Sequence, residues 1–402
     1  MSFSPRTLWR RLVAWLVSPP MVRWWAGPQL TLRGPRVPAR PFDLKNVQRL
    51  LVVRYDGMGD LVVMTGFLRE LRRAAPQAKI SLLIRSEWVP LMRANPHLDE
   101  VLAFKAEAYP SYQLFWRHRD ALAYARQELW PRRFEAVLVP QTEFSFYDAR
   151  ILAYLSGAPV RIGWADPQSA AGSGGRSLLT QFIAIPAQFH EADKGYHFLE
   201  ALGGQVRERQ LELHWDSAAD ELAAGMAARL QPTGCRLVAV GLGASQANKL
   251  WPVERFVDVA KDLAGRMPVR FVGIGGGDLV AQGERLEAGL GDLAVSLAGK
   301  LALPQTAALL ARCDLFVGCD SGPMHVAAAV GTPVVSLSGC PTDAPAEYSA
   351  HPGRIGPYCA KRRVVQPPVT GRGTDFFTDE IRTADVREAV HSLAVEAGLL
   401  PA

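Results

Sequence analysis

The sequence lacks the features that define several large classes of protein. Its 402 residues include five cysteines, an odd number, with no CxxC pair among them. This excludes a disulfide framework as the organising principle, and we expect a reducing compartment. The apolar run at 12–17 is far too short to cross a bilayer, which takes about 20 residues. Prolines and arginines follow it without a small-residue cleavage site, so a secretory signal also fits poorly.

Several catalytic motifs are also missing. No GxxxxGK[ST] sequence occurs, which excludes a P-loop nucleotidase. The segment 318–322 is not the GxSxG elbow of a hydrolase, because its serine stands in the wrong place. No HExxH, paired CxxC or Asp-x-Asp motif offers metal ligands. We therefore expect chemistry that needs no metal.

The positive charge is confined to one end of the chain. The net charge is +6, but residues 1–46 alone carry +7, so the rest of the chain is nearly neutral. This argues against nucleic-acid binding across the body of the protein. The same segment holds Trp9, Trp15, Trp24 and Trp25 among its arginines. Interleaved Trp and Arg favour an amphipathic segment on an anionic membrane surface. A helix that packs its tryptophans on its own domain, or a disordered tail, would give the same composition.

Strands and helices alternate in two long stretches. A chain of 402 residues is long for one core, so two domains are expected. Apolar runs predict strands at 49–56, 80–84, 101–104, 136–139, 160–162, 236–241, 269–274, 293–297, 314–317 and 334–337. Helical patterns separate them, which predicts parallel βαβ units in an α/β fold. The joint is expected at 231–234. A glycine-rich insertion at 163–189 interrupts the alternation and would be either a cover over an acceptor or a disordered loop.

The most informative stretch runs from 315 to 337. An apolar strand leads into the turn Asp320-Ser321-Gly322, and a helix of small residues begins at Pro323. The free N–H groups of the first turn, with Ser321 and Gly322, would form an anion pocket that His325 can reach. A buried strand–turn–helix unit with a capping Asp or Ser is the simpler alternative.

Three further turns carry candidate residues. Ser245 and Lys249 follow the strand at 236–241, and Lys249 could neutralise a departing phosphate unless it is merely a solvated lysine. Asp278 closes a glycine-rich turn that could face a base or ribose, although a dinucleotide fingerprint is incomplete. In the first half, Gly59-Asp60 begins a helix at a strand end. Asp60 is either a helix cap or a general base in the crevice where such sheets bind ligands.

Together these segments resemble glycosyltransferase family 9, the heptosyltransferase-like enzymes, over residues 49 to about 358. The stretch 51–65 looks like the family's first strand and Gly-Asp turn, and 243–252 is similar to its donor-phosphate loop. Asp320-Ser-Gly-Pro-Met-His325 resembles the most specific signature, and Gly339-Cys-Pro-Thr-Asp343 resembles the Gly-Pro-Thr-Asp loop.

The resemblance implies a GT-B fold, in which two Rossmann-like, doubly wound parallel-sheet domains face each other across a cleft. It places an extension at 1–46, an acceptor domain at 47–230 and a nucleotide-sugar domain at 231–402. It implies inverting, metal-independent transfer without a cofactor, ADP-heptose being the favoured donor and lipopolysaccharide core the acceptor, at the cytoplasmic face of the membrane.

Residue by residue, the resemblance makes Asp60 the catalytic base and Lys249 and Ser245 the diphosphate contacts. Gly59, Asp320, Ser321, Gly322 and His325 would also bind the donor, and Asp278 would hold its ribose. The extension at 1–46 and the insertion at 163–189 depart from the family and bear on the acceptor. A non-hydrolysing sugar-nucleotide epimerase and a catalytically silent nucleotide-sugar-binding module are the alternative functions.

Overall fold

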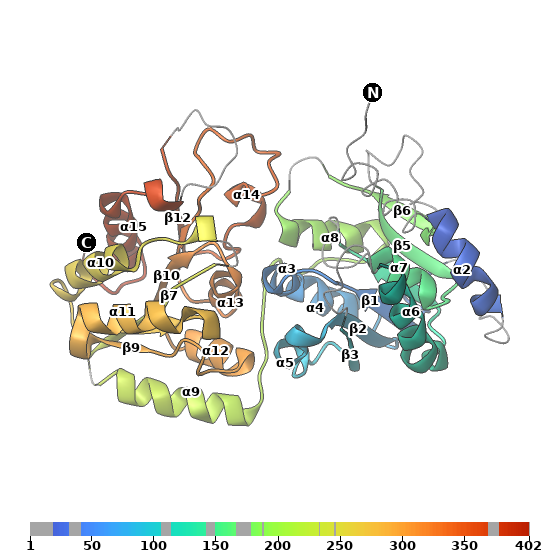
Figure 1. Cartoon of the computed structure of the whole chain (residues 1–402), viewed down its shortest axis with the longest axis horizontal. Coiled ribbons are helices and arrows are strands. Elements are labelled where there is room, and N and C mark those ends of the chain that lie inside the picture. Colours follow the sequence, from blue (N-terminus) through green and yellow to red (C-terminus); the bar gives the residue numbers. More distant parts are fainter. Residues whose placement is uncertain are drawn as a thin grey trace.

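The fold consists of two parallel sheets, each flanked by helices (Figure 1). The computed structural model describes residues 19–31, 42–105, 114–141, 149–165, 178–186, 189–232, 234–244, 247–368 and 378–401. Every strand pairing within both sheets is parallel. This confirms the predicted doubly wound α/β class.

The first sheet has the strand order β3-β2-β1-β4-β5-β6. Its strands are β1 (Arg49–Val53), β2 (Lys79–Arg85), β3 (Glu100–Phe104), β4 (Ala136–Val139), β5 (Val160–Ala165) and β6 (Gln181–Ala184). Because side chains alternate along a strand, Leu50 and Val52 of β1 enter one apolar cluster while Leu51 and Val53 enter another. The sheet is therefore buried on both faces, as an all-parallel sheet must be.

Helices supply the two covering layers of this first domain. They are α2 (Pro19–Thr31), α3 (Met58–Val63), α4 (Thr65–Ala74), α5 (Val89–Met92), α6 (Leu114–Tyr124), α7 (Ala149–Leu155) and α8 (Glu191–Ala201). Apolar residues of α3, α4, α5 and α8 join the first cluster, and those of α2 and α7 join the second.

The second sheet repeats this topology with the order β12-β11-β10-β7-β8-β9. Its strands are β7 (Arg236–Gly241), β8 (Val269–Ile274), β9 (Ala294–Ser296), β10 (Leu315–Cys319), β11 (Val334–Leu337) and β12 (Arg362–Val365). The helices are α9 (Ser217–Leu230), α10 (Val253–Ala264), α11 (Val280–Leu290), α12 (Leu303–Leu310), α13 (Gly322–Ala329), α14 (Pro352–Ile355) and α15 (Thr383–Glu396). In each sheet the domain's first strand pairs with its second on one side and its fourth on the other.

The crossing between the domains lies earlier in the chain than the expected joint at 231–234. Helix α9 packs against α12 of the second domain, and its Asp220 accepts a hydrogen bond from Arg312 at 2.8 Å. The segment 203–216, which has no regular secondary structure, leads from α8 to α9. We therefore propose a domain boundary within 203–216 in place of 230/231.

The insertion at 163–189 is not wholly a loop. Strand β5 continues to Ala165, and β6 adds a sixth strand to the sheet, with Ile162 opposite Gln181 in the register. The glycine-rich residues 166–177 of the predicted cover lie outside the described residues.

Helix α2 belongs to the amino-terminal extension, and it lies at the end of the first domain remote from the second (Figure 1). Its Val22 and Ala26 are fully buried, and Trp25 stacks on His118 with ring centroids 5.3 Å apart. Trp24 points outward and is 74% exposed. The alternative of a helix packing on its own domain thus holds for Trp25, while Trp9 and Trp15 lie outside the described residues. Among the described helices, none has the length and apolar character to cross a bilayer.

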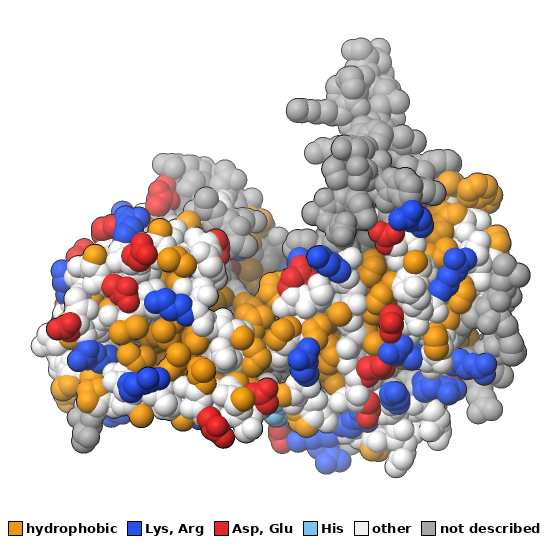
Figure 2. All heavy atoms as spheres, turned by 60° about the horizontal axis from the view of Figure 1, so that its bottom comes forward, with side chains coloured by type: hydrophobic (Ala, Val, Ile, Leu, Met, Phe, Trp, Pro, Cys, Tyr) orange, Lys and Arg blue, Asp and Glu red, His pale blue; other side chains and the backbone are white. Residues whose placement is uncertain are grey.

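Both signs of charge are distributed over one face of the molecule. Figure 2 shows acidic side chains beside basic ones over both domains on the face that it draws. This agrees with the near-neutral charge of the chain beyond residue 46.

Candidate functional site

The candidate residues lie at the carboxyl ends of three central strands. Asp60 follows β1, Lys249 follows β7, and Asp320 follows β10. In each sheet the strand order reverses beside the domain's first strand, and parallel α/β sheets bind ligands at this switch point. The two switch points are brought together because α3 of the first domain packs on α13 of the second.

Two glycines allow this close approach. A Cβ atom added at Gly59 would lie 2.6 Å from Cδ2 of His325, and one added at Gly322 would lie 1.9 Å from Cε of Met58. Real Cβ contacts are longer, so a side chain at Gly59 would displace the His325 ring, and one at Gly322 would displace the terminal methyl group of Met58. Gly59, Gly322 and His325, all predicted from sequence, therefore meet at one interdomain contact.

Asp60 occupies the first turn of α3. Its Oδ2 atom accepts a hydrogen bond from the Gly57 N–H at 3.2 Å, which satisfies an otherwise unpaired donor at the helix start. Its Oδ1 atom lies 3.7 Å from the Arg54 guanidinium, and the Asp60 side chain is 44% exposed. Asp60 is thus a cap, as one alternative held, and it also presents a carboxylate to solvent at the strand end.

Lys249 and Asp320 form an ion pair on the second domain. The Lys249 Nζ lies 3.6 Å from Asp320 Oδ2, and both side chains are mostly buried. Ser321 precedes α13, but its hydroxyl donates to the Cys319 carbonyl at 3.1 Å and does not cap the helix. The alternative in which the Ser321 side chain caps α13 is therefore wrong.

His325 connects the two halves electrostatically. Burial is the main cause that lowers the pKa of its ring, and the charge of Lys249 adds to this. The carboxylates of Asp320 and Asp60 act in the opposite direction. The charges that act on this imidazole come from both domains. The close approach of Gly59 to His325 and the Lys249–Asp320 ion pair set these residues around the contact of α3 with α13, and we refer to Asp60, Lys249, Asp320 and His325 as the cluster.

Two predicted residues are not joined to this cluster by a described contact. Asp278 is exposed in the turn after β8, close to Gly276. The neighbouring Leu279 packs against Gly243, so the turn adjoins the loop that follows β7. Ser245 lies outside the described residues.

Sequence reasoning missed the buried pair beneath Asp60. Arg54 Nε lies 2.7 Å from Asp56 Oδ2, and its NH1 donates to the Pro140 carbonyl at 2.9 Å. Burial raises the pKa of Asp56 to about 7, although Arg54 opposes the shift. The only sequence signal was the Arg-Tyr-Asp run at the end of a strand. This pair holds Arg54 in place to face Asp60.

A second interdomain contact, also missed, joins α8 to the segment around α14. His190 Nε2 bonds to the Gly356 carbonyl at 2.9 Å, and Tyr358 donates to Asp193 at 2.8 Å. Glu191 lies 3.3 Å from Arg354. Because these partners come from both domains, the start of α8 forms a polar latch, by which we mean His190, Glu191 and Asp193 with their partners.

The His190 contact predicts a pH dependence of stability. Burial lowers the pKa of His190 to about 4. Its Nδ1 accepts the Ala192 N–H at 3.1 Å, a bond that protonation would break. The unfolded chain, with a pKa of about 6.5, binds the proton more readily, so this stabilisation is complete above pH 6.5 and is lost as the pH falls toward 4, by up to about 3 kcal/mol.

We expect His190→Asn, which keeps a cap acceptor but cannot titrate, to flatten the fall in Tm between pH 6.5 and 4.5. Calorimetry at several pH values measures this. His351→Asn is the matched control, because His351 caps α14 through the same Nδ1 bond but outside the latch. If Tm falls with pH equally steeply in both variants, His190 is not the cause of the pH dependence.

Comparisons with known proteins agree with this geometry. The family model described as glycosyltransferase family 9 (heptosyltransferase) matches residues 123–366. Lipopolysaccharide heptosyltransferase 3 of Escherichia coli is 25% identical over 288 residues, which cover 70% of this chain and 80% of that protein. The crystal structure of the glycosyl transferase family 9 from Veillonella parvula DSM 2008 has a TM-score of 0.72 at 25% identity, covering 89% of this chain and all of that one.

The structure of E. coli heptosyltransferase WaaC with ADP has a TM-score of 0.67 at 19% identity, covering 86% of this chain and 100% of that one. It shares the fold, which is therefore GT-B, as predicted. Since the family model spans more than half of the sequence, the chain belongs to glycosyltransferase family 9 and is a glycosyltransferase.

Proposed function

We propose that the chain transfers a heptose from ADP-heptose to a lipopolysaccharide-core acceptor, with inversion and without a metal in the transfer step. The observation that carries the proposal is the packing of α3 on α13, which sets Gly59, the neighbour of Asp60, against the His325 ring. Asp320, the ion-pair partner of Lys249, directly precedes Ser321 and the start of α13. The first domain, which forms one wall of the proposed site, thus offers a base. The second domain, which forms the other wall, offers a site for an anion.

On the first wall, Asp60 acts as the general base. The acceptor hydroxyl gives its proton to the Asp60 carboxylate while its oxygen bonds to the anomeric carbon. The hydrogen bond from the Gly57 N–H fixes the carboxylate, and the Arg54 guanidinium lies 3.7 Å from its Oδ1 atom. Attack from the side opposite the leaving group inverts the configuration.

On the second wall, the bond from the anomeric carbon to the diphosphate oxygen breaks and leaves negative charge on the nucleotide. Lys249 meets this charge as a point cation, and the N–H groups at the start of α13 offer further hydrogen bonds. Ser245 and Asp278 are proposed to hold the diphosphate and the ribose.

The donor and acceptor follow from relatives. WaaC binds ADP, and the E. coli relative is a lipopolysaccharide heptosyltransferase. We expect ADP-heptose to raise the Tm by mass action more than UDP- or GDP-sugars at equal concentration. Incubation with ADP-heptose and core acceptor should release ADP. Release of ADP that does not depend on the acceptor, or interconversion of the free donor, would favour the epimerase or a hydrolase instead.

We also propose contact with the inner face of the cytoplasmic membrane through the extension at 1–46. The outward Trp24 on the docked helix α2 supports this. We expect Trp24→Ser to reduce co-sedimentation with anionic vesicles several-fold, because the indole is lost from the interface. Leu222→Ser, which alters another exposed apolar residue on α9, is the control. Equal binding by wild type and Trp24→Ser would contradict a role for this tryptophan.

A further inference from the structure

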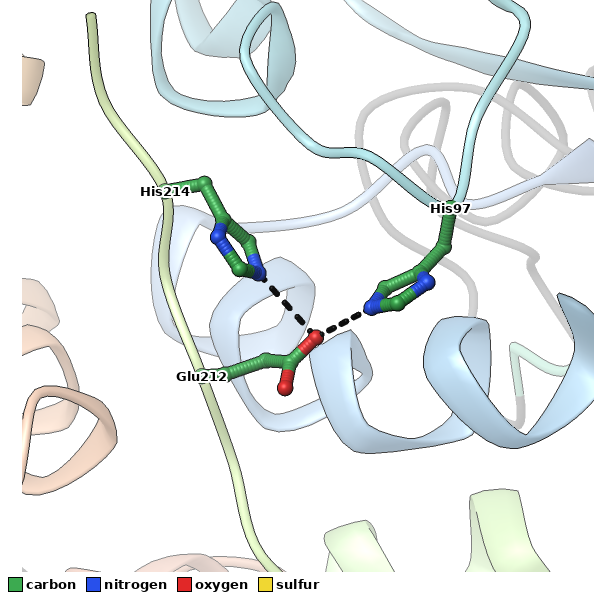
Figure 3. A group of neighbouring side chains, drawn as sticks. All are labelled: His97, Glu212 and His214. Atoms are coloured by element: carbon green, nitrogen blue, oxygen red, sulfur yellow. Dashed lines mark hydrogen bonds and ion pairs between the residues drawn. The ribbon is translucent and has the colours of Figure 1, made fainter. Parts of the chain in front are cut away.

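Two histidines and a glutamate converge at the surface where the interdomain segment leaves the first domain. His97 lies in the turn before β3, and Glu212 and His214 lie on the segment 203–216 (Figure 3). His97 Nε2 lies 2.6 Å from Glu212 Oε1, and His214 Nε2 lies 3.1 Å from the same oxygen. The three ligand atoms all fall within 4.8 Å of one another.

We propose that His97, Glu212 and His214 bind one divalent transition-metal ion of the Zn²⁺ class, with water completing its coordination. Two imidazoles and one carboxylate suit zinc and its neighbours, whereas Mg²⁺ and Ca²⁺ prefer oxygen ligands throughout. Three protein ligands with an open fourth position are a common zinc arrangement.

The geometry requires little rearrangement. Zinc bonds of about 2.0 to 2.1 Å in a tetrahedron separate the ligand atoms by about 3.3 Å. The His214–Glu212 distance of 3.1 Å is close to this, and the His97–Glu212 pair would widen by less than 1 Å. The two rings already lie edge to face, at 79°, with their Nε2 atoms directed at one carboxylate oxygen.

The ligands are also held by their surroundings. The His97 N–H donates to Asn95 Oδ1 at 2.9 Å, and the Glu212 N–H donates to Thr65 Oγ1 at 3.1 Å. The buried Arg69 lies 2.8 Å from Glu212 Oε2, the oxygen that faces away from the histidines. Supporting contacts of this kind orient the side chains that bind a metal ion.

Charge and access favour a cation as well. The ion pairs around the site join three arginines (Arg69, Arg72 and Arg73) to four carboxylates (Glu70, Asp99, Glu208 and Glu212), which leaves one negative charge. The three side chains are 20 to 34% exposed, which allows an ion to enter.

The position of the site gives it a structural role. Arg69 and Thr65 of α4 fasten Glu212 to the first domain, while Trp215 donates to Asp220 of α9 in the second. The chain therefore passes from contacts with the first domain to contacts with the second between residues 212 and 215. A metal ion bound by His97, Glu212 and His214 would hold His214 against the first domain. This would shorten the free segment between the domains and so limit the motion of one domain against the other.

The test uses the full chain after treatment with a chelator. Titration with Zn²⁺ should show one tight site, and Co²⁺ should give the visible absorption of a low-symmetry nitrogen and oxygen site. His97→Gln and His214→Gln, whose amides can still donate to Glu212, should each weaken this site roughly tenfold or more. His391→Gln, on the exposed face of α15, is the matched control.

The Tm without metal checks that each variant is folded, and added Zn²⁺ should raise the Tm of wild type and of His391→Gln more than that of the two ligand variants. If wild type binds no Zn²⁺ below millimolar concentration, or if both ligand variants keep the same tight site, the proposal is wrong. The result is independent of heptose transfer, which the assay of ADP release measures separately.

Discussion

Replacing Asp60 by asparagine should abolish most turnover while leaving nucleotide binding nearly intact. The amide oxygen can still accept the Gly57 N–H, so α3 should keep its first turn. The proton acceptor is lost, however, and general bases contribute roughly 10²- to 10⁴-fold to rate. We expect kcat to fall within this range, measured as ADP release, with the affinity for ADP changed little in a calorimetric titration.

The matched control for this variant is Asp385→Asn. Asp385 occupies the same third position of α15 that Asp60 occupies in α3, but it pairs with the exposed Arg382. It should keep wild-type activity. A variant Asp60→Asn with wild-type kcat would show that another group takes the proton. If the wild-type protein binds ADP but shows no turnover, it is the catalytically silent nucleotide-sugar-binding module.

Replacing Lys249 by methionine should weaken the site for the diphosphate specifically. The cation is lost from a mostly buried position, and the loss of one such stabilising group costs about 10²- to 10³-fold in kcat. ADP should bind more weakly, whereas adenosine, which lacks the diphosphate, should bind as before. Steady-state kinetics and paired titrations with ADP and adenosine measure both effects.

Because Lys249→Met also leaves the buried Asp320 without its ion-pair partner, a Tm measurement must accompany the kinetics. Lys249→Arg, which keeps the charge, should recover part of the rate. Lys261→Met, on α10, is the control for loss of a lysine from the same domain. Equal weakening of ADP and adenosine would indicate a general disturbance of the domain and count against a diphosphate role.

The central strands and their turns could be predicted because their signals are local. The apolar run of β10, the Asp320-Ser321-Gly322 turn and the small residues of α13 are contiguous in sequence. Parallel strands then force such turns to the same edge of the sheet. Two of the four edge strands, β6 and β12, were not predicted, because each has only one buried residue and neither shows an apolar run.

The remaining site residues depend on tertiary contacts that the sequence does not display. His190 meets Gly356 across 166 positions, and His97 meets Glu212 across 115. The alanine stripe of α9, which includes Ala219, Ala223 and Ala227, predicts a buried helix face but not which domain covers it. Pairings of this kind arise only when the two domains and the segment between them are assembled.

The docking of α2 bears on how the enzyme would meet a lipid surface. Since Val22 and Ala26 are buried in the first domain, the outward direction of Trp24 is fixed relative to the first sheet. An attachment through this helix would be rigid, and would set the tilt of the protein and the height of its reaction centre above the headgroups. The reach of the enzyme would then be matched to acceptors whose sugar chain ends at that height.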